Sequence, residues 1–349
     1  NVKKILFSLP LLLIPILSFT QAGFFKLGND INGEAAGDES GISVGINSSG
    51  NRIAIGAHKN DGNGSNSGHV RIYEDNGGNW IQMGSDIDGE SANDNFGLSV
   101  DLSDDGQTLV VGNRGHDTDS YNETGAIYIY EYDPANNRWI EKGDHIVGKE
   151  STNYKLGNSV SINGDGTIVA IGEYGYNWSS TSNFDGATFI YKWNGNDWVL
   201  MGNRIDASTT GEYFGYSVSI DSEGSKVAIG AYQYQSQFGT TRIYHWNGND
   251  WTLIDSQVDG TSSYGAFGKT VSISSDGSVV AGGAPANRDQ GLSTGATSVY
   301  NIADPNARTT GNLYVAGDIS LNSRLYIQNT DILSYIQSLE SRIQTLENP

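Results

Sequence analysis

The chain has 349 residues, with 46 Gly, 6 Pro, 19 Tyr and 7 Trp, a mixture typical of many short strands joined by tight turns. Its 40 acidic residues against 20 Lys and Arg give a formal charge of −20, which makes phosphate backbones and anionic lipid surfaces poor partners. There is no Cys, which excludes disulfides, thiolate metal sites and cysteine nucleophiles.

The first 22 residues read as a secretory signal. Lys3 and Lys4 form a basic start, residues 5–19 are an apolar run, and Thr20 and Ala22 suit a signal-peptidase site. The run is short and interrupted by Pro, so a retained membrane anchor is the less favoured alternative. We therefore expect a secreted or surface-exposed protein that does not contact the membrane after signal removal.

The middle of the chain repeats one unit five times. Each copy has a glycine in a motif such as "GLSV", and a second glycine follows fifteen residues later in all five copies. The first glycines are Gly41, Gly97, Gly157, Gly215 and Gly268, and the second are Gly56, Gly112, Gly172, Gly230 and Gly283. Between them, segments such as "SVDLSDDGQTLVVG" read as strand, tight turn and strand, with Gly supplying the positive φ of the turn.

Two further strands follow in each copy. A third glycine precedes a tyrosine by five residues and marks the third strand, and a tryptophan then opens the fourth strand in four of the copies. The third glycines are Gly68, Gly125, Gly186, Gly239 and Gly295, and the tryptophans are Trp80, Trp139, Trp198 and Trp251. We expect these aromatic residues to lie in the core because they are locked to the repeat.

The fifth copy lacks its tryptophan strand, and the opening fragment supplies a matching one. In "FFKLGNDING", Phe24 precedes Gly28 by four residues, as each tryptophan precedes a glycine. A fourth strand at one terminus that is missing at the other predicts a closed ring, which removes the exposed sheet edges. The predicted fold is all-β: a five-bladed β-propeller of four-stranded blades over residues 23–302, closed by residues 23–27. The copies span about residues 28–83, 84–142, 143–201, 202–254 and 255–302.

The C-terminal part has a different pattern. Residues 303–329 alternate apolar and polar residues, which predicts a linker with short strands. Residues 330–349 then carry an a/d seam of apolar residues at steps of four and three: Ile332, Ile336, Leu339, Ile343 and Leu346. We expect a coiled-coil helix that joins copies of the chain into a homo-oligomer, and the open alternative is a helix packed on its own domain.

The repeat resembles the FG-GAP repeat family, known from the propeller of integrin alpha chains. The resemblance rests on segments such as "FGLSVDLSDDGQTLVVG" and "FGYSVSIDSEGSKVAIGA" and spans all five copies. It implies a propeller. The integrin domain has seven blades against five here, and calcium-bearing members use a longer D-x-D-x-D-G-x-x-D loop where this chain has short turns. The tail also resembles strand repeats in fibre-like surface proteins of marine viruses.

A binding site is expected on the face that carries the loops between second and third strands, because these loops vary in length on a regular frame. The third and fourth of these loops are rich in aromatic residues. Aromatic rings beside amide, hydroxyl and carboxyl groups suit sugars. The candidate ligand-binding residues are Tyr121, Tyr174, Tyr176, Trp178, Phe184, Tyr232, Tyr234 and Phe238. The alternative is that the rings only pack the loops together.

Two loops carry oxygen ligands that Ca²⁺ could use, although neither completes a known calcium loop. The candidates are Asp117, Asp119 and Glu123 in one loop and Asp61 and Asn63 in another; solvated loop acids are the favoured interpretation. The five histidines share no metal-binding spacing in the sequence. No cofactor is required by this pattern.

Catalysis has little support. No nucleophile elbow or phosphate loop is present, and a propeller glycoside hydrolase would need two axial carboxylates. Asp101 is the one acid in a first strand, where we expect it to accept hydrogen bonds near the axis. The sequence favours a non-enzymatic recognition or adhesion protein that binds an extracellular glycan or surface protein. The alternatives are a structural surface or virion component and, less favoured, a glycoside hydrolase.

Overall fold

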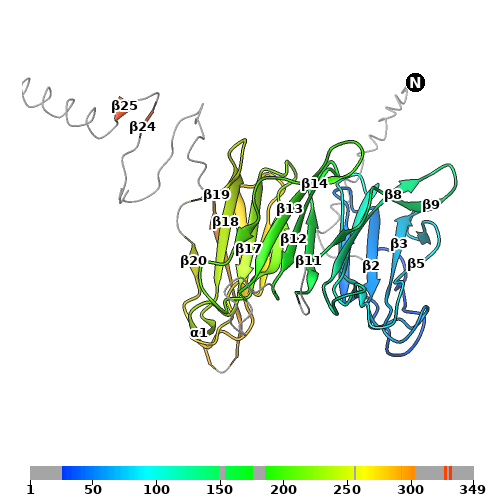
Figure 1. Cartoon of the computed structure of the whole chain (residues 1–349), viewed down its shortest axis with the longest axis horizontal. Coiled ribbons are helices and arrows are strands. Elements are labelled where there is room, and N and C mark those ends of the chain that lie inside the picture. Colours follow the sequence, from blue (N-terminus) through cyan, green and yellow to red (C-terminus); the bar gives the residue numbers. More distant parts are fainter. Residues whose placement is uncertain are drawn as a thin grey trace, which may run out of the picture.

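The structure is a computed structural model that describes residues 26–148, 154–175, 185–254, 257–291 and 293–302, with the backbone of 326–327 and 330–331. It is an all-β structure of repeated antiparallel sheets, as expected of a β-propeller. The sheets stand side by side in chain order, from β2 at the right of Figure 1 to β18 at the left. Within the described residues, α1 (Tyr234–Gln237) is the one helix, and none is long and apolar enough to cross a membrane.

The five sheets share one topology, in which the first strand pairs with the second and the second with the third. The first sheet is β1 (Ser43–Ile46), β2 (Arg52–Ala57), β3 (His69–Asp75), β4 (Trp80–Gln82) and β5 (Ile87–Asp88). The second is β6 (Phe96–Leu102), β7 (Thr108–Asn113), β8 (Ala126–Asp133), β9 (Arg138–Glu141) and β10 (Ile146–Val147). In both sheets the last two strands pair with the third strand, β3 or β8.

The remaining sheets repeat this plan. The third is β11 (Leu156–Ile162), β12 (Ile168–Glu173), β13 (Ala187–Trp193), β14 (Trp198–Leu200) and β15 (Ile205–Asp206). The fourth is β16 (Phe214–Ile220), β17 (Lys226–Ala231), β18 (Thr240–Trp246), β19 (Trp251–Leu253) and β20 (Val258–Asp259). The fifth has three described strands, β21 (Thr270–Ile273), β22 (Val279–Ala284) and β23 (Ala296–Asn301).

The fixed spacing of glycines has a packing cause. An added Cβ at Gly56 would lie 2.0 Å from the carbonyl oxygen of Gly97, and one at Gly112 would lie 2.1 Å from that of Gly157. Gly172 and Gly230 face the next sheet in the same way. The second glycine of each copy therefore lets the first glycine of the next sheet approach, and a side chain there would push the sheets apart.

Each junction between sheets is filled by aliphatic side chains. Val100 and Leu102 of β6 lie in one buried cluster with Val70 and Ile72 of β3, and the later junctions use the same positions. Burying one such side chain contributes roughly 1.5–3 kcal/mol. In the first strands these are the large residues that alternate with small or polar ones in the sequence, as Val100 and Leu102 do in "SVDL".

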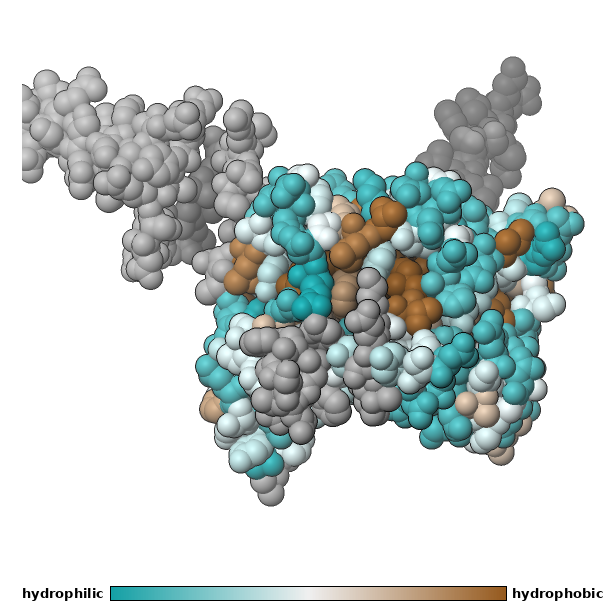
Figure 2. Space-filling model, in the orientation of Figure 1, coloured by the Kyte–Doolittle hydropathy of each residue, from teal (hydrophilic) through white to brown (hydrophobic). Residues whose placement is uncertain are grey.

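The tryptophans lie in the outer part of the junctions. Trp198 and Trp251 are buried as predicted, whereas Trp80 and Trp139 are half-buried. Each indole Nε1 donates to the carbonyl of the residue that directly follows the preceding fourth strand: Trp139 to Met83 (2.9 Å), Trp198 to Lys142 (2.7 Å) and Trp251 to Met201 (2.9 Å). Val199 and Leu200, which follow Trp198 in β14, stay exposed. Figure 2 shows hydrophobic side chains gathered over β14.

At the end of the sheets opposite the loops between second and third strands, the hairpin turns are joined by backbone hydrogen bonds. The amide of each turn donates to the next: Ser48 N to Asp104 O, Asp104 N to Gly164 O, Gly164 N to Ser222 O and Ser222 N to Ser275 O, at 2.9–3.1 Å. This chain of bonds runs from the first sheet to the fifth and keeps the sheets in one register.

The first and fifth sheets each leave one apolar face open. Val44 and Ile46 of β1 are 66% and 62% exposed, whereas the equivalent Val100 and Leu102 are 8% and 5% exposed. Val299 of β23 is 65% exposed. Among the described residues, no hydrogen bond joins the fifth sheet to the first.

The start of the described chain lies where the repeat predicts. Trp80 Nε1 donates to Leu27 O at 3.1 Å, which is the bond that the later tryptophans make to the preceding fourth strand. Leu27 thus occupies the position that Met83, Lys142 and Met201 hold directly after a fourth strand. Phe24 and the predicted signal over residues 1–22 lie outside the described residues.

The structure describes only four residues of the C-terminal region that was predicted to form short strands and a coiled-coil helix. β24 (Tyr326–Ile327) and β25 (Thr330–Asp331) pair as a short antiparallel ladder, in line with short strands in this region. Thr330 and Asp331, at the predicted start of the coiled-coil helix, belong to this ladder. The coiled-coil helix stays a prediction. The apolar seam from Ile332 onward lies outside the described residues.

Candidate functional site

A cluster of four tyrosines lies at the loop-rich end of the third and fourth sheets. Its members are Tyr174, Tyr213, Tyr216 and Tyr232. The rings of Tyr174 and Tyr213 stack with centroids 5.7 Å apart, and Tyr216 meets Tyr174 and Tyr232 edge-on at 5.3 and 4.6 Å. Such offset and edge contacts stabilise aromatic groups beyond their burial. We call these residues the tyrosine cluster.

The repeat places these rings together. Tyr174 and Tyr232 each stand two residues after the second glycine of their copy, and Tyr216 directly follows Gly215, the first glycine of the fourth copy. Because that glycine packs against the end of the preceding second strand, these positions of neighbouring sheets converge. Tyr213, which has a positive φ of 56°, ends the entering loop and turns its ring into the same group.

Cationic side chains border the cluster. Lys155 Nζ lies 5.9 Å from the Tyr174 ring centre, and Lys269 Nζ lies 5.5 Å from that of Tyr232. Desolvation raises the pKa of the Tyr174 hydroxyl, and nearby Arg114 opposes the shift. Lys155 also lies 3.6 Å from the Glu123 carboxylate, whereas Lys269 is exposed. In a chain with formal charge −20, this end combines aromatic faces with positive charge.

Residues 87–130, which run from β5 through most of β8, match the family model of the FG-GAP repeat. The chain contains an FG-GAP repeat. The resemblance inferred from the glycine pattern is thereby confirmed for this segment. No curated protein matches the chain.

The FG-GAP match covers most of the second sheet, and the residues of the tyrosine cluster lie outside it. The matched segment includes the glycines that let sheets approach, Gly97 and Gly112, and the strand core around them. At the position of Tyr174 and Tyr232, the copy within the FG-GAP match has Arg114. The tyrosine cluster is therefore a feature of the third and fourth copies rather than of the repeat.

The structure separates the other predicted aromatic candidates. Tyr234 packs under the Arg242 guanidinium, 5.3 Å from its ring centre, and Phe238 lines a small cavity of the fifth sheet with Phe267 and Tyr300. Tyr121 is exposed on the loop of the FG-GAP segment. The candidates Tyr176, Trp178 and Phe184 lie outside the described residues. Of the predicted candidates that the structure describes, Tyr174 and Tyr232 join the cluster and Tyr121, Tyr234 and Phe238 do not.

Sequence reasoning missed Tyr213, Tyr216 and Lys269. All three stand near a first glycine of the repeat, outside the loops between second and third strands from which the candidates were chosen. The glycine spacing of the repeat could have identified them. The first glycine of one copy packs against the second glycine of the preceding copy, so residues beside the first glycine lie near the loop after the second strand of the preceding sheet.

The two loops proposed for Ca²⁺ use their acids within the loop. Asp117 Oδ1 accepts from the backbone N–H of Glu123 at 2.7 Å, and Asp61 Oδ1 accepts from that of Asn66 at 2.8 Å. Asn63 Nδ2 donates to Gly89 O at 2.9 Å. Together with Asp119, these residues do not form a group of converging ligand atoms within the described part of the chain. Calcium binding there stays a prediction.

Asp101 behaves as expected of a single acid near the axis. Its carboxylate accepts from Leu102 N at 2.9 Å, from Ile162 N at 3.0 Å and from Ser161 Oγ at 3.1 Å. Desolvation nevertheless raises the pKa of Asp101 to about 6, although these hydrogen bonds oppose the shift. The carboxylate bridges the second and third sheets, which gives it a structural role.

Proposed function

We propose that this protein is a secreted or surface-exposed recognition protein that binds a glycan with the loop-rich end of its sheets. The observation that carries the proposal is the tyrosine cluster with cations at its border. Aromatic faces pack on the C–H faces of sugar rings, and Lys and Tyr side chains supply polar partners for hydroxyl or carboxyl groups. The second ligand class that this chemistry would accept is a surface protein. Its acidic groups would pair with the lysines, and its apolar side chains would pack on the tyrosine rings.

The binding proposal is tested with a glycan array probed with the full chain after signal removal. The expected result is selective binding that falls about fivefold in Tyr232→Ala and in Lys269→Ala, since a stacked ring and a cation–π contact each contribute on the order of 1 kcal/mol. Tyr264→Ala, an exposed ring outside the cluster, is the matched control. Binding that is absent, or equal in all variants, would favour a structural surface component.

We further propose that the first and fifth sheets meet and close a five-bladed ring. Gly283 and Gly295 stand at positions where every other copy needs glycine for the approach of the next sheet. Val44, Ile46 and Val299 occupy positions that are buried or apolar at every other junction. Residues 24–27 would then serve as the fourth strand of the fifth sheet.

Ring closure is tested by placing a charge at the proposed junction. Val44→Asp should destabilise the protein as severely as Val218→Asp at a filled junction, because both charges would be buried. Deletion of residues 24–27 should also lower the melting temperature. A Val44→Asp variant with native stability would contradict the closed ring, and sedimentation separates closure within one chain from cover by a second copy.

The predicted C-terminal coiled coil would cluster the binding ends and raise weak single-site affinity by avidity. Sedimentation of the full chain against a chain ending at residue 303 tests this. Equal masses for the two would exclude the coiled coil as the source of oligomers.

A further inference from the structure

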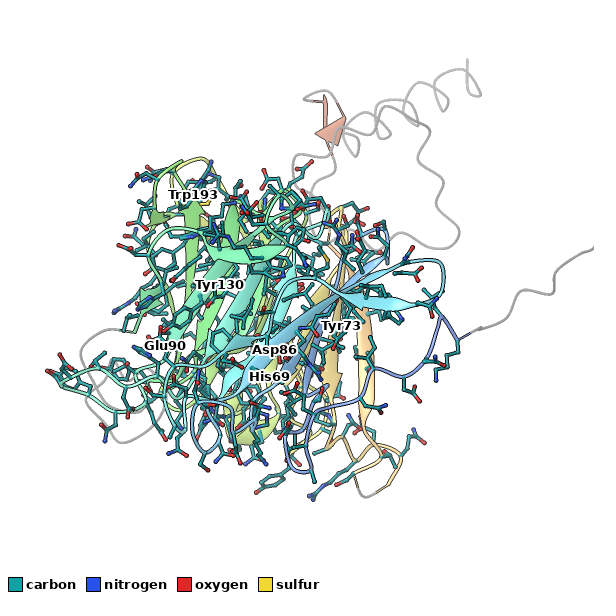
Figure 3. All side chains as sticks on the ribbon, turned by 90° about the vertical axis from the view of Figure 1, so that its right-hand side faces the viewer. His69, Tyr73, Asp86, Glu90, Tyr130 and Trp193 are labelled. Carbon is teal, nitrogen blue, oxygen red and sulfur yellow. The ribbon has the colours of Figure 1, made fainter. Side chains whose placement is uncertain are left out.

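A histidine and three carboxylates meet at the start of the first sheet, away from the tyrosine cluster. β3 begins with His69, and β5 pairs with it in a register that sets His69 opposite Asp88 and Val70 opposite Ile87. Because side chains alternate along a strand, Asp86 and Asp88 lie on the same face as His69. Figure 3 shows His69 and Asp86 next to each other, with Tyr73 further along β3.

The entering loop of the first sheet adds the third carboxylate, Glu34. His69 Nδ1 lies 3.7 Å from Glu34 Oε2, 3.8 Å from Asp86 Oδ2 and 4.0 Å from Asp88 Oδ1. The ligand atoms of Glu34, His69 and Asp86 all lie within 4.8 Å of one another. No other such group occurs among the residues that the structure describes.

The histidine nitrogen is buried and without a hydrogen-bond partner. His69 is 1% exposed, and its Nδ1 has no acceptor or donor within hydrogen-bond distance. A buried polar atom without a partner costs about 1–3 kcal/mol, so its retention needs a compensating contact. The imidazole is aimed into the gap between the carboxylates, which are themselves open to solvent at 27–47% exposure.

Neighbouring side chains hold the carboxylates in place. Gln82 Nε2 donates to Asp86 Oδ1 at 2.5 Å, which leaves Oδ2 facing His69. Arg71 Nη1 lies 3.7 Å from Glu34 Oε1, and Glu34 Oε2, which accepts a long hydrogen bond from Asn60 Nδ2 at 3.5 Å, faces His69. Outer contacts of this kind orient the ligands of metal sites in proteins.

Charge and spacing both favour a divalent cation here. Three carboxylates against Arg71 leave a net charge of −2 when the imidazole is neutral. Metal–ligand bonds of about 2.0–2.2 Å place two ligands of a tetrahedral ion roughly 3.4 Å apart. The distances from His69 Nδ1 to Glu34 Oε2 and Asp86 Oδ2, 3.7 and 3.8 Å, need only a few tenths of an ångström of contraction, and all three ligand atoms lie within 4.8 Å of one another.

We propose that Glu34, His69 and Asp86 bind one divalent transition-metal ion of the Zn²⁺ class, with Asp88 at the edge of the site. An imidazole with carboxylates suits Zn²⁺ and its neighbours, whereas Ca²⁺ takes six to eight oxygen ligands. The bound ion would tie the entering loop at Glu34 to β3 and β5. The site differs in place and ligands from the calcium loops considered above.

The first sheet alone carries this ligand set. At the positions of His69 and Asp86, the second sheet has Ala126 and His145, and the fourth has Thr240 and Gln257. The chain should therefore bind one ion tightly rather than one for each sheet.

The test titrates ZnCl₂ into the chelator-stripped full chain against a fluorescent competing chelator. The expected result is one Zn²⁺ per chain, with affinity reduced at least about tenfold in His69→Gln, Asp86→Asn and Glu34→Gln. His145→Gln, a half-exposed histidine beside Glu141, is the matched control and should bind like the native chain. X-ray absorption should show oxygen and nitrogen ligands with one imidazole and no sulfur.

Three outcomes would overturn the proposal: no stoichiometric Zn²⁺ binding, binding unchanged in all three site variants, or Ca²⁺ bound as tightly as Zn²⁺ without dependence on His69. Glu34→Gln keeps the test valid if His69→Gln fails to fold, because Glu34 is half-exposed and lies on a loop. Circular dichroism of each variant separates loss of the site from loss of the fold.

Discussion

The first and fourth sheets carry charged residues at equivalent positions, but the charges are paired and buried in the fourth sheet and partly exposed in the first. In the fourth sheet, Arg242 stands where the first has Arg71, and its Nη2 donates to Glu212 Oε2 at 2.7 Å. The same guanidinium donates to Ser208 Oγ at 2.7 Å and to Gln257 Oε1 at 2.8 Å. Both charges are almost wholly buried, at 3% and 0% side-chain exposure.

In the first sheet, the matching space holds three acids, one arginine and a histidine nitrogen without a partner. The backbone is the same in both sheets, so the repeat does not decide the chemistry. The fourth sheet pairs its buried charges with each other, whereas the first sheet has more carboxylates than cations and leaves these carboxylates partly exposed to solvent. A repeat frame of this kind positions side chains, and function depends on which side chains each copy carries.

The largest effect is expected from breaking the buried pair of the fourth sheet. Arg242→Met leaves Glu212 buried without a counter-charge, which should cost about 3–5 kcal/mol in the free energy of unfolding. Arg71→Met at the same position of the first sheet should cost about 1 kcal/mol, because Glu34 is half-exposed and stays hydrated. Chemical denaturation measures both, and equal costs would remove the contrast between the sheets.

An intermediate effect is expected at the axis, where the second sheet has Asp101 and the fourth has Ser219. With a pKa of about 6, Asp101 in the folded state holds a proton that the unfolded state releases near pH 4. The stabilisation that the protonated Asp101 gives to the folded state is full below about pH 4 and is lost as pH rises through 6.

Asp101→Ser should remove this dependence of stability on pH, because serine does not titrate. A serine fits the position, since Ser219 stands there in the fourth sheet and its Oγ accepts a hydrogen bond from Ile273 N of the next sheet. Relative to the native chain, the variant should gain about 2 kcal/mol in unfolding free energy between pH 4 and pH 7.5. Parallel denaturation curves at the two pH values provide the measurement. A native–variant difference that does not vary with pH would refute the raised pKa.

The smallest effect is expected from Glu34→Gln in the presence of a chelator. The carboxylate is 47% exposed, and its contact with Arg71 at 3.7 Å is a solvent-screened pair. The free energy of unfolding should change by less than about 0.5 kcal/mol without metal. A larger loss would mean that Glu34 supports the fold itself, and the first sheet would then resemble the fourth more closely than its geometry suggests.

Much of the frame could be predicted from the sequence because it rests on local rules that recur. The glycines at fixed spacing, the alternating first strands and the tryptophans each report a packing requirement that every copy shares. The site residues do not recur, so no internal comparison pointed to them. His69 and Asp86 are seventeen residues apart and meet only because β5 folds back onto β3, which spacing along the chain does not reveal.

The turn-to-turn hydrogen bonds at the end opposite the loops have a mechanical consequence. Bonds such as Ser48 N to Asp104 O and Ser222 N to Ser275 O connect successive sheets, each turn being linked to the next. Once the proposed junction between the first and fifth sheets is open, a force that separates these two sheets loads the remaining junctions in series, so the weakest junction opens first. Single-molecule extension of such an array should proceed in discrete steps, one sheet at a time.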